Sequence, residues 1–396
     1  MDIPQGYKQT ELGIIPDDWE VKRISDFTSI ITGGTPSTLR PEYWGGNIMW
    51  MSSGELNKKF VFDVEGRITT EGLLNSSTHM IPPFCVLIGL AGQGKTRGTA
   101  AYNYISLCTN QSIAAILPND KYDSLYLYYV VDSKYDYLRL LSSGDGGRGG
   151  LNKNLLNSLE IVFPKTIAEQ RAIAEALSDI DGLIAALDKK IAKKRLIKQG
   201  AMQQLLTGKK RLPGFTDSWV EKKLGEILDY EQPQPYLVVS TDYVDSGIPV
   251  LTAGKSRILG YTTEQFGIYN KLPVIIFDDF TTDSKYISYP FKVKSSAMKE
   301  LSLKNNDYDL RLVYELMQQI DFPLKDHQRY WISEYSQLTI SIPKDREEQT
   351  AIATILTDMD KEIADLEAKR DKYSLLKSGM MQKLLTGQIR LKINRI

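Results

Sequence analysis

From Pro164 the chain reads PKTIAEQRAIAEALSDIDGLIAALDKKIAKKRLIKQGAMQQLLTGKKRL, and from Pro343 it reads PKDREEQTAIATILTDMDKEIADLEAKRDKYSLLKSGMMQKLLTGQIRL. The two stretches align without a gap at a constant offset of 179, with 26 of 49 positions identical. A gapless match of this length indicates an internal duplication, and a duplication means that the chain repeats one structural unit. We therefore interpret the rest of the sequence around these two copies.

Both copies predict long helices with similar ends. Thr166 with Glu169, and Asp345 with Glu348, have the spacing of a capping box, and Gly208 and Gly387 stand where a helix takes a left-handed last residue. Apolar side chains between these ends follow a heptad. They form a narrow seam that needs one partner helix, and the other copy is the obvious partner. The predicted seam consists of Ile173, Leu177, Ile180, Ile184, Leu187 and Ile191 in the first copy and Ile352, Leu356, Met359, Ile363, Leu366 and Tyr373 in the second.

The charges of the two copies favour an antiparallel pair. The first helix is acidic in its first half and basic in its second half, from Lys189 to Lys198, and the second helix has acids from Asp358 to Glu367 and bases from Arg370 to Lys383. Opposite charges face each other only if the helices run in opposite directions. Acids early and bases late also suit the dipole of any single helix, which is the alternative explanation.

Length and composition set broad limits. With 396 residues, two or more domains are expected, and 42% hydrophobic residues is ordinary for a globular protein. The longest apolar runs, such as 84–91, are far too short to span a bilayer, and residues 1–4 do not begin a signal peptide. Two cysteines, Cys85 and Cys108, are too few for a disulfide framework, so we expect a cytoplasmic protein. The net charge of zero still allows local basic patches.

The segments before each copy resemble each other at their ends only. Residues 1–163 and 213–342 both begin with a tryptophan-containing segment, around Trp19 and Trp219, and both end in a short strand before a proline. Short β-rich segments with few helices predict an α+β domain in each. The fold class we predict is therefore two pseudo-symmetric α+β domains, residues 1–163 and 213–342, joined by two long helices, 164–212 and 343–396, packed as an antiparallel coiled coil.

This order of domains and helices resembles the specificity (S) subunit of type I restriction–modification enzymes along essentially the whole chain. The motifs that carry the resemblance are the paired EQxAIAxxL…LLTG helices, ITGGTPST from Ile31, IPDDWE, NQSIA, and the run from Pro249 to Tyr335. The resemblance implies two target recognition domains, each reading one half of a split sequence in double-stranded DNA. It also implies that the helices set the spacing and dock two methyltransferase (modification) subunits.

Further expectations follow from the resemblance alone. Two restriction/translocase subunits join the full complex, and S-adenosylmethionine, ATP and Mg²⁺ belong to the partner subunits, with no cofactor bound by this chain. The chain itself is then non-catalytic, a subunit of an adenine-N6 DNA methyltransferase and restriction endonuclease. No convincing catalytic constellation and no metal site stands out in the sequence.

One motif offers an enzymatic alternative. Residues 89–96, GLAGQGKT, satisfy the Walker A pattern, and VIIFDD from Val274 resembles a Walker B strand. Against a P-loop, Gly98 breaks the helix that should follow Lys95, and residues 86–88 and 275–277 look like corresponding strands of the two repeats. Another alternative is a coiled-coil adaptor without DNA affinity, which leaves the two α+β domains without a role.

Basic and amide side chains in glycine-rich or aromatic loops are the candidates for DNA contact, because phosphate needs cations and base edges need guanidinium or amide groups. Tyrosines interleaved with bases suit a polar DNA surface, although Tyr330 followed by Trp331 equally suits a core. The candidates are Gln93, Lys95, Arg97 and Arg148 in the first domain, and Lys255, Arg257, Lys285, Tyr286, Lys294, His327, Arg329 and Tyr330 in the second.

A helical spacer predicts that its length sets the unspecified gap in the target. Inserting a few residues between Ala185 and Lys193 should lengthen that gap and leave both half-sites unchanged, because each residue adds ~1.5 Å of helix. Sequencing the methylated sites of the insertion variant measures both quantities. An altered half-site with the old gap would contradict the prediction.

Overall fold

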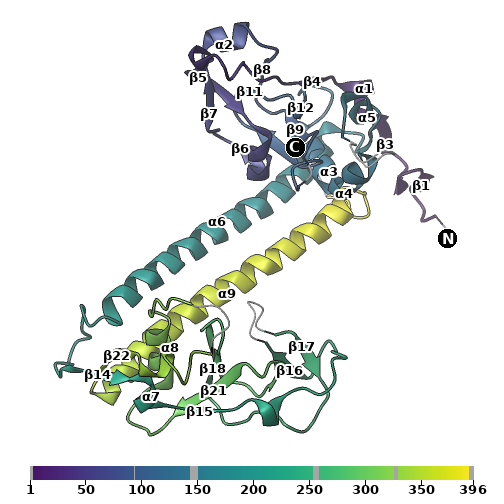
Figure 1. Cartoon of the computed structure of the whole chain (residues 1–396). Coiled ribbons are helices and arrows are strands. Elements are labelled where there is room, and N and C mark those ends of the chain that lie inside the picture. Colours follow the sequence, from purple (N-terminus) through teal and green to yellow (C-terminus); the bar gives the residue numbers. More distant parts are fainter. Residues whose placement is uncertain (1–2, 93, 143–149, 253–257, 325–328, 392–396) are drawn as a thin grey trace. The chain divides into compact units, whose positions relative to one another are not determined.

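The computed structural model describes residues 3–92, 94–142, 150–252, 258–324 and 329–391 of the chain. These residues form two units (Figure 1). Unit 1 comprises residues 1–188 and 369–396, and unit 2 comprises residues 189–368. Each long helix is therefore divided between the units, at residues 188 and 368.

Unit 1 contains two main sheets. The first has the strand order β4-β12-β9-β10-β6 and the second has the order β7-β5-β11-β8. Two further pairs, β1 with β2 and β13 with β3, lie outside them. The strands are β1 (Tyr7–Thr10), β2 (Gly13–Pro16), β3 (Glu20–Arg23), β4 (Ile30–Thr32), β5 (Trp44–Met51), β6 (Phe60–Val61), β7 (Gly66–Ile68), β8 (Met80–Ile81), β9 (Val86–Gly89), β10 (Ala100–Asn103), β11 (Leu107–Thr109), β12 (Ile113–Ile116) and β13 (Glu160–Phe163).

Several short helices of unit 1 begin with side-chain caps that the sequence supplies. Asp123 accepts the N–H of Tyr126 at the start of α3, and Asn152 accepts the N–H of Leu155 at the start of α5. The helices are α1 (Ile24–Phe27), α2 (Thr70–Leu74), α3 (Ser124–Ser133), α4 (Tyr135–Leu141) and α5 (Lys153–Asn157), with 3-10 turns at Pro41–Tyr43 and Ser53–Lys58.

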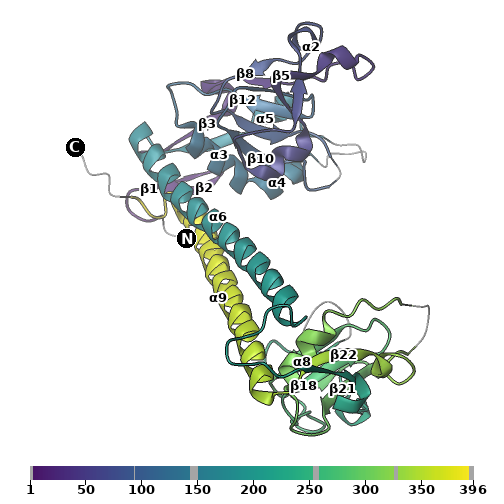
Figure 2. The same cartoon turned by 90° about the vertical axis from the view of Figure 1, so that its left-hand side faces the viewer.

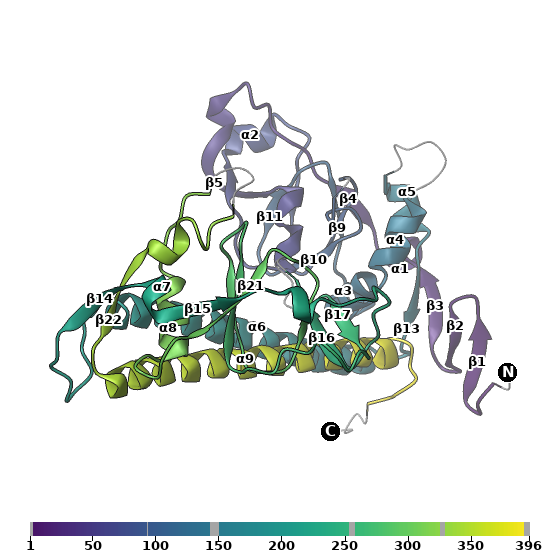
Figure 3. The same cartoon turned by 60° about the horizontal axis from the view of Figure 1, so that its bottom comes forward.

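Unit 2 (its elements are labelled in Figure 3) repeats most of the strand order of unit 1, without counterparts of β1, β2, β6 and β8 among its described residues. Its sheets run β15-β21-β18-β19 and β17-β16-β20, which repeat the orders β4-β12-β9-β10 and β7-β5-β11 with the same parallel and antiparallel neighbours. The predicted equivalence of β9 and β18 is confirmed. The elements are β14 (Trp219–Lys223), α7 (Leu224–Ile227), β15 (Leu228–Glu231), β16 (Ile248–Leu251), β17 (Gly260–Thr262), β18 (Val274–Asp278), β19 (Ser284–Ile287), β20 (Lys292–Val293), β21 (Met298–Leu303), α8 (Leu310–Met317) and β22 (Thr339–Pro343), with 3-10 turns at Gln234–Tyr236 and Tyr335–Gln337.

The long helices are α6 (Ile167–Leu205) and α9 (Arg346–Leu384), and within each unit their segments lie side by side and run antiparallel (Figures 1 and 2). In unit 1, Asp181 pairs with Lys377 at 2.7 Å and Asp188 with Arg370 at 3.5 Å. In unit 2, α6 pairs with α9 through Lys194–Glu362 and Lys198–Asp360. These pairs confirm the direction predicted from charge. Every residue of the predicted seam is buried or half-buried.

Each long helix ends on a left-handed glycine packed against a tryptophan. Gly208 has φ +67° and Gly387 has φ +71°, as the sequence predicts. A Cβ on Gly208 would lie 3.5 Å from the Trp219 ring in unit 2, and one on Gly387 would lie 2.5 Å from Pro16 and 3.3 Å from Trp19 in unit 1. The end of α9 thus packs against the N-terminal segment of the chain, where the Tyr7 hydroxyl also donates to the Gly387 carbonyl.

The predicted capping boxes are only half formed. Thr166 Oγ1 accepts the N–H of Glu169 at 3.2 Å, and Asp345 accepts the N–H of Glu347. The acids do not close the box, because both oxygens of Glu169 bind the Arg390 guanidinium at 2.7 Å, and those of Glu348 bind Arg211 at 2.6 and 2.7 Å. The Glu169–Arg390 and Glu348–Arg211 pairs occupy equivalent positions of the two copies, at the offset of 179.

Glutamines next to these acids attach each helix to its domain. In unit 1 the Gln170 side chain accepts the N–H of Asp123, the cap of α3, and donates to the carbonyl of Pro164. In unit 2 Gln349 accepts the N–H of Asp309, the cap of α8, and donates to the carbonyl of Pro343. The duplicated glutamine therefore has the same structural role twice.

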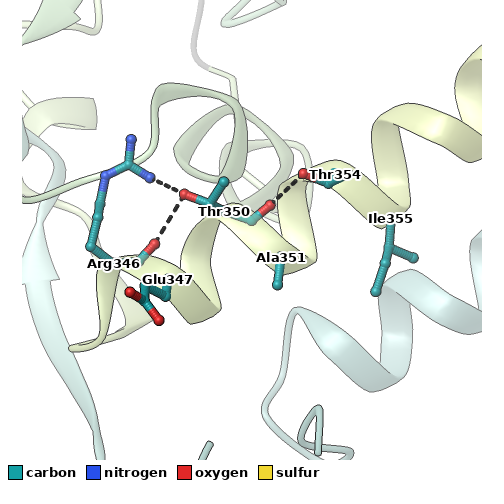
Figure 4. A pocket seen from close by; sticks show the side chains of 6 residues that line it. All are labelled: Arg346, Glu347, Thr350, Ala351, Thr354 and Ile355. Carbon is teal, nitrogen blue, oxygen red and sulfur yellow. Dashed lines mark hydrogen bonds between the residues drawn. The ribbon is translucent and has the colours of Figure 1, made fainter.

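The first turns of α9 carry a shallow hollow of about 550 Å³ (Figure 4). Arg346 spans one turn to donate to Thr350, and it also pairs with Asp309 of α8 at 2.8 Å. Ala351 and Ile355 supply the apolar side of the hollow. None of the predicted DNA contacts is among the residues that line this hollow.

An unpartnered acid lies in the apolar interior of unit 2. Glu300 on β21 is fully buried, and neither carboxylate oxygen has a hydrogen-bond partner among the described residues. Burial raises the pKa of Glu300 to about 8 from its ordinary 4.5, so the side chain is protonated in the folded protein near neutral pH.

Replacing this acid should change the pH dependence of stability. The folded pKa lies above the unfolded one, so the stability of the chain falls as pH rises from 4.5 through about 8. Glu300→Gln carries no charge at any pH. Its stability relative to wild type should therefore rise over this interval, by at most ~1.4 kcal/mol per pH unit. Paired thermal and urea unfolding from pH 5 to 9 measures this difference.

Glu221→Gln is the matched control, because Glu221 is an exposed acid of the same unit. Its effect on the free energy of unfolding should not grow with pH. A constant difference between Glu300→Gln and wild type at every pH would contradict the burial argument.

Candidate nucleic-acid interface

The Walker A-like segment of unit 1 forms a hairpin loop. β9 is followed by β10, which pairs with it antiparallel, Ala100 opposite Ile88. Gly98 has φ +82° and its N–H donates to the carbonyl of Gly89, which closes the loop. A P-loop needs a helix after the lysine to bind phosphate at its N-terminus, so the P-loop alternative is wrong.

Helix α4 supports this loop from one side. The Tyr135 hydroxyl donates to the carbonyl of Lys95 at 3.1 Å, and Arg139 donates to the carbonyl of Gly94 at 2.7 Å. The Lys95 side chain is exposed and that of Arg97 is half-buried. The two candidates therefore lie on a loop whose backbone is fixed by a helix, a suitable arrangement for presenting cations to a ligand.

Two candidate lysines of unit 2 lie beside the end of β16. Lys285 Nζ donates to the carbonyl of Thr252 at 3.2 Å, and the backbone N–H of Lys294 donates to the carbonyl of Leu251 at 2.9 Å. The Lys294 side chain is exposed. Strands β19 and β20, separate in the sequence, thus bring two cations to one strand end.

Tyr286 lies on the other face of β19 from Lys285, because side chains alternate along a strand. Its half-buried ring packs near Tyr314 on α8, and the Arg311 guanidinium lies 5.2 Å from its centre. Burial raises the pKa of Tyr286. Arg311 in turn pairs with Asp360 on α9 at 2.6 Å. Tyr286 therefore faces the helices of unit 2, and the two neighbours do not share one surface.

Arg329 and Tyr330, neighbours in the sequence, also lie in different environments. The Arg329 side chain is exposed, and its guanidinium lies 5.8 Å from the ring centre of Phe280, which follows β18. Tyr330 is fully buried, with its ring 5.1 Å from that of Phe322. The prediction that Tyr330 contacts DNA is wrong, because an apolar core surrounds its ring. Arg329 remains available at the surface.

Five predicted contacts lie outside the described residues: Gln93, Arg148, Lys255, Arg257 and His327. The structure therefore does not test them. Of the seven other candidates, Lys95 and Arg97 lie on one loop of unit 1, and Lys285, Lys294 and Arg329 lie on the surface of unit 2. The remaining two, Tyr286 and Tyr330, face the helices and the core.

Some residues around these loops were not singled out from the sequence. Arg139 contacts the loop of unit 1 although 42 positions separate it from Arg97. Asp279, read as part of a Walker B motif, instead accepts the backbone N–H groups of Tyr330 and Trp331. No local pattern indicates either contact, because both join segments far apart in the sequence.

Three bases in the second half of α6 are bound to α9. Lys194 and Lys198 pair with Glu362 and Asp360, as described, and Arg195 pairs with Glu367. Lys193 has an exposed side chain with no ion-pair partner in the described part of the chain. The Lys193 side chain is therefore not bound to the other helix, unlike those of Lys194 and Arg195.

The duplicated sequence and the duplicated topology correspond to a known domain. The model of the type I restriction modification DNA specificity domain matches the chain twice, over residues 16–194 and 216–373. The chain belongs to this family. It is a type I restriction–modification specificity subunit with two specificity domains.

Specificity subunits of two organisms are similar in sequence. The EcoR124I/EcoR124II specificity subunit of Escherichia coli is 50% identical over 148 residues, a match that spans 36% of each chain. The MjaVIII specificity subunit of Methanocaldococcus jannaschii is 24% identical over 418 residues, covering 96% of this chain and 94% of the relative. The MjaIX subunit of the same organism is 35% identical over 186 residues, 41% of its length.

Two solved structures share the fold. The S subunit of a type I restriction–modification system from M. genitalium has a TM-score of 0.69 and 16% identity, covering 100% of this chain and 99% of that one. A chain from a structure on complex assembly and conformational transition of the type I R-M system has a TM-score of 0.54 and 12% identity, covering 95% and 99%. No described helix of this specificity subunit is long and apolar enough to cross a membrane.

Proposed function

We propose that this specificity subunit reads a bipartite DNA target, one half-site with each unit, and docks two methyltransferase subunits. The observation that carries the proposal is the repeated topology: the two units share the order of most strands and one attachment to the long helices, while their loops differ. A common frame with different loops suits one task performed on two different sequences.

The surface chemistry of the loops supports DNA as the ligand. Arg97 in unit 1 and Arg329 in unit 2 carry guanidinium groups, which match the acceptor edge of guanine in the major groove. Lys95 and Lys294 have exposed ammonium groups, which suit phosphate contacts that position the protein without specifying sequence. Both kinds of contact are therefore available in each unit.

A duplicated apolar surface supports two copies of a protein partner. In unit 2, α6 exposes Leu196 and Ile197, which are 68% and 45% exposed. In unit 1, α9 exposes their repeats Leu375 and Leu376, which are 76% and 48% exposed. Exposed apolar pairs at equivalent positions of a duplication fit a partner that binds twice.

Glycines next to these pairs strengthen the argument. Gly200 and Gly379 lie inside the helices, where glycine costs about 1 kcal/mol relative to alanine. A Cβ at either position would meet no atom within 4 Å, so the fold of the chain does not require glycine there. Close approach of a partner explains both.

The chemistry belongs to the partners in this proposal. The chain binds no cofactor, and the methyltransferase subunits bring S-adenosylmethionine and transfer the methyl group to adenine N6. Two restriction/translocase subunits bring the ATP- and Mg²⁺-dependent steps. The complex acts on double-stranded DNA in the cytoplasm, where the free cysteines Cys85 and Cys108 remain reduced.

Substitutions in the two units should affect different half-sites. Arg97→Ala should relax one half-site and Arg329→Ala the other, each by ~1–3 kcal/mol of discrimination, whereas Lys294→Ala should weaken all sequences alike. Selection from a random duplex pool, with the methyltransferase subunit bound, measures both half-sites at once. A continuous motif, or equal loss on specific and random DNA for both arginine variants, would overturn the proposal.

Charges placed on the exposed apolar pairs should remove the partners one at a time. Leu196→Glu with Ile197→Glu, or Leu375→Glu with Leu376→Glu, should each lower the number of bound methyltransferase subunits from two to one, because a carboxylate in an apolar contact is strongly disfavoured. Native mass spectrometry counts the subunits. Leu39→Glu is the control, since Leu39 is 89% exposed but lies outside the helices. Two bound copies in every variant would exclude these surfaces.

A further inference from the structure

Two consecutive aspartates at the end of β18 have different roles in unit 2. Asp278 Oδ1 accepts the N–H groups of Phe280 and Thr281 at 2.9 and 3.2 Å, which forms the turn to β19. Asp279 instead accepts the N–H groups of Tyr330 and Trp331, at 3.1 and 2.8 Å, from a segment some 50 residues later in the chain. The pair thus joins the β18–β19 turn to the segment that contains Arg329.

Asp279 is a charged group deep in the unit. It is 1% exposed, and its other oxygen lies 3.4 Å from Nζ of Lys299, which is also 1% exposed. Lys299 donates to the Gln232 side chain at 2.8 Å. The carboxylate is thereby compensated by one buried cation and two backbone donors.

A buried ion pair of this kind is weak evidence for stability. Removing two charges from water costs several kcal/mol, and apolar residues of similar size often serve the fold equally well. What the ion pair adds is one defined geometry, because the carboxylate satisfies its donors in a single arrangement. That geometry fixes the backbone of residues 330 and 331, whose side chains are buried at 0% and 2% exposure.

The surface next to the ion pair carries an exposed aromatic–cation pair. Phe280 directly follows Asp279 and is 45% exposed. The Arg329 guanidinium lies 5.8 Å from its ring centre, within the range of a cation–π contact. Arg329 directly precedes the two residues whose N–H groups Asp279 holds. The Asp279 carboxylate therefore holds the segment that presents the guanidinium, while the neighbouring Asp278 carboxylate forms the turn that presents the ring.

We propose that Asp279 is a positioning residue for target reading by unit 2, acting through the Lys299-paired carboxylate to hold Arg329 over Phe280 in the orientation that contacts a base edge. The inference rests on the proposed bipartite reading of DNA. It assigns to unit 2 a specificity determinant that never touches the DNA itself.

The test compares two variants with the wild-type chain, each bound to the methyltransferase subunit. Asp279→Asn keeps the shape and removes the charge. Asp279→Leu with Lys299→Met replaces the buried pair by apolar side chains and leaves no unpaired cation in the core. Selection from a random duplex pool measures discrimination at each half-site, and thermal unfolding sets the temperature at which every variant is folded.

Both variants should lose discrimination at the half-site that Arg329→Ala relaxes, by about 5- to 150-fold, the range of a lost arginine–base contact. The other half-site should keep its wild-type discrimination, and it serves as an internal control for folding and assembly. Asp283→Asn, an exposed aspartate of the same turn, should leave both half-sites unchanged.

Two results would overturn the assignment. Full discrimination at both half-sites in the folded variants would mean that the ion pair does not position Arg329. Equal loss at both half-sites would mean that it acts only on stability. A wild-type chain with no half-site preference would instead refute the proposed function itself.

Discussion

The antiparallel pairing of the two long helices depends on a buried carboxylate in the first turn of each helix. Glu169 and Glu348 are 3% and 0% exposed, and a carboxylate at such depth is costly unless it is paired. Each is bound by an arginine that follows the end of the other helix, Arg390 or Arg211. The start of one helix is therefore tied to the end of the other in both units, which only an antiparallel pair permits.

The pairing of the long helices is the same in both units, while some of their contacts to the domains differ. Asp181 and its repeat Asp360 each pair with a lysine of the facing helix, Lys377 or Lys198. In unit 1 the same carboxylate also accepts the Tyr129 hydroxyl, and in unit 2 it binds Arg311 of α8. The same aspartate thus accepts from a neutral hydroxyl in one unit and binds a cation in the other. The domain residue at this contact can therefore differ without a change in the helices.

The sequence predicted the helix pair well because the two copies of the repeat can be aligned with each other directly. Direction, seam and terminal glycines all follow from residues within one helix or its copy. The interface was predicted less well, since neighbours in sequence take opposite faces, as Lys285 and Tyr286 do on β19. Tyr330 is buried because Asp279, about 50 positions earlier, holds its backbone. The capping boxes remain open because their acids bind distant arginines. Local spacing contains no information on such contacts.

The two units also anchor one equivalent segment by different means. In unit 1 the residue after β9, Leu90, accepts the N–H of Leu151 through its backbone carbonyl. In unit 2 the residue after β18, Asp279, uses its side chain as well as its carbonyl. A carbonyl is present whatever the residue, whereas a carboxylate depends on one side chain and its buried counter-ion. The orientation of this segment in unit 2 therefore depends on a few replaceable side chains, while the topology that supports it depends on the whole sheet. This separation allows the loops to diverge between two domains that share one fold.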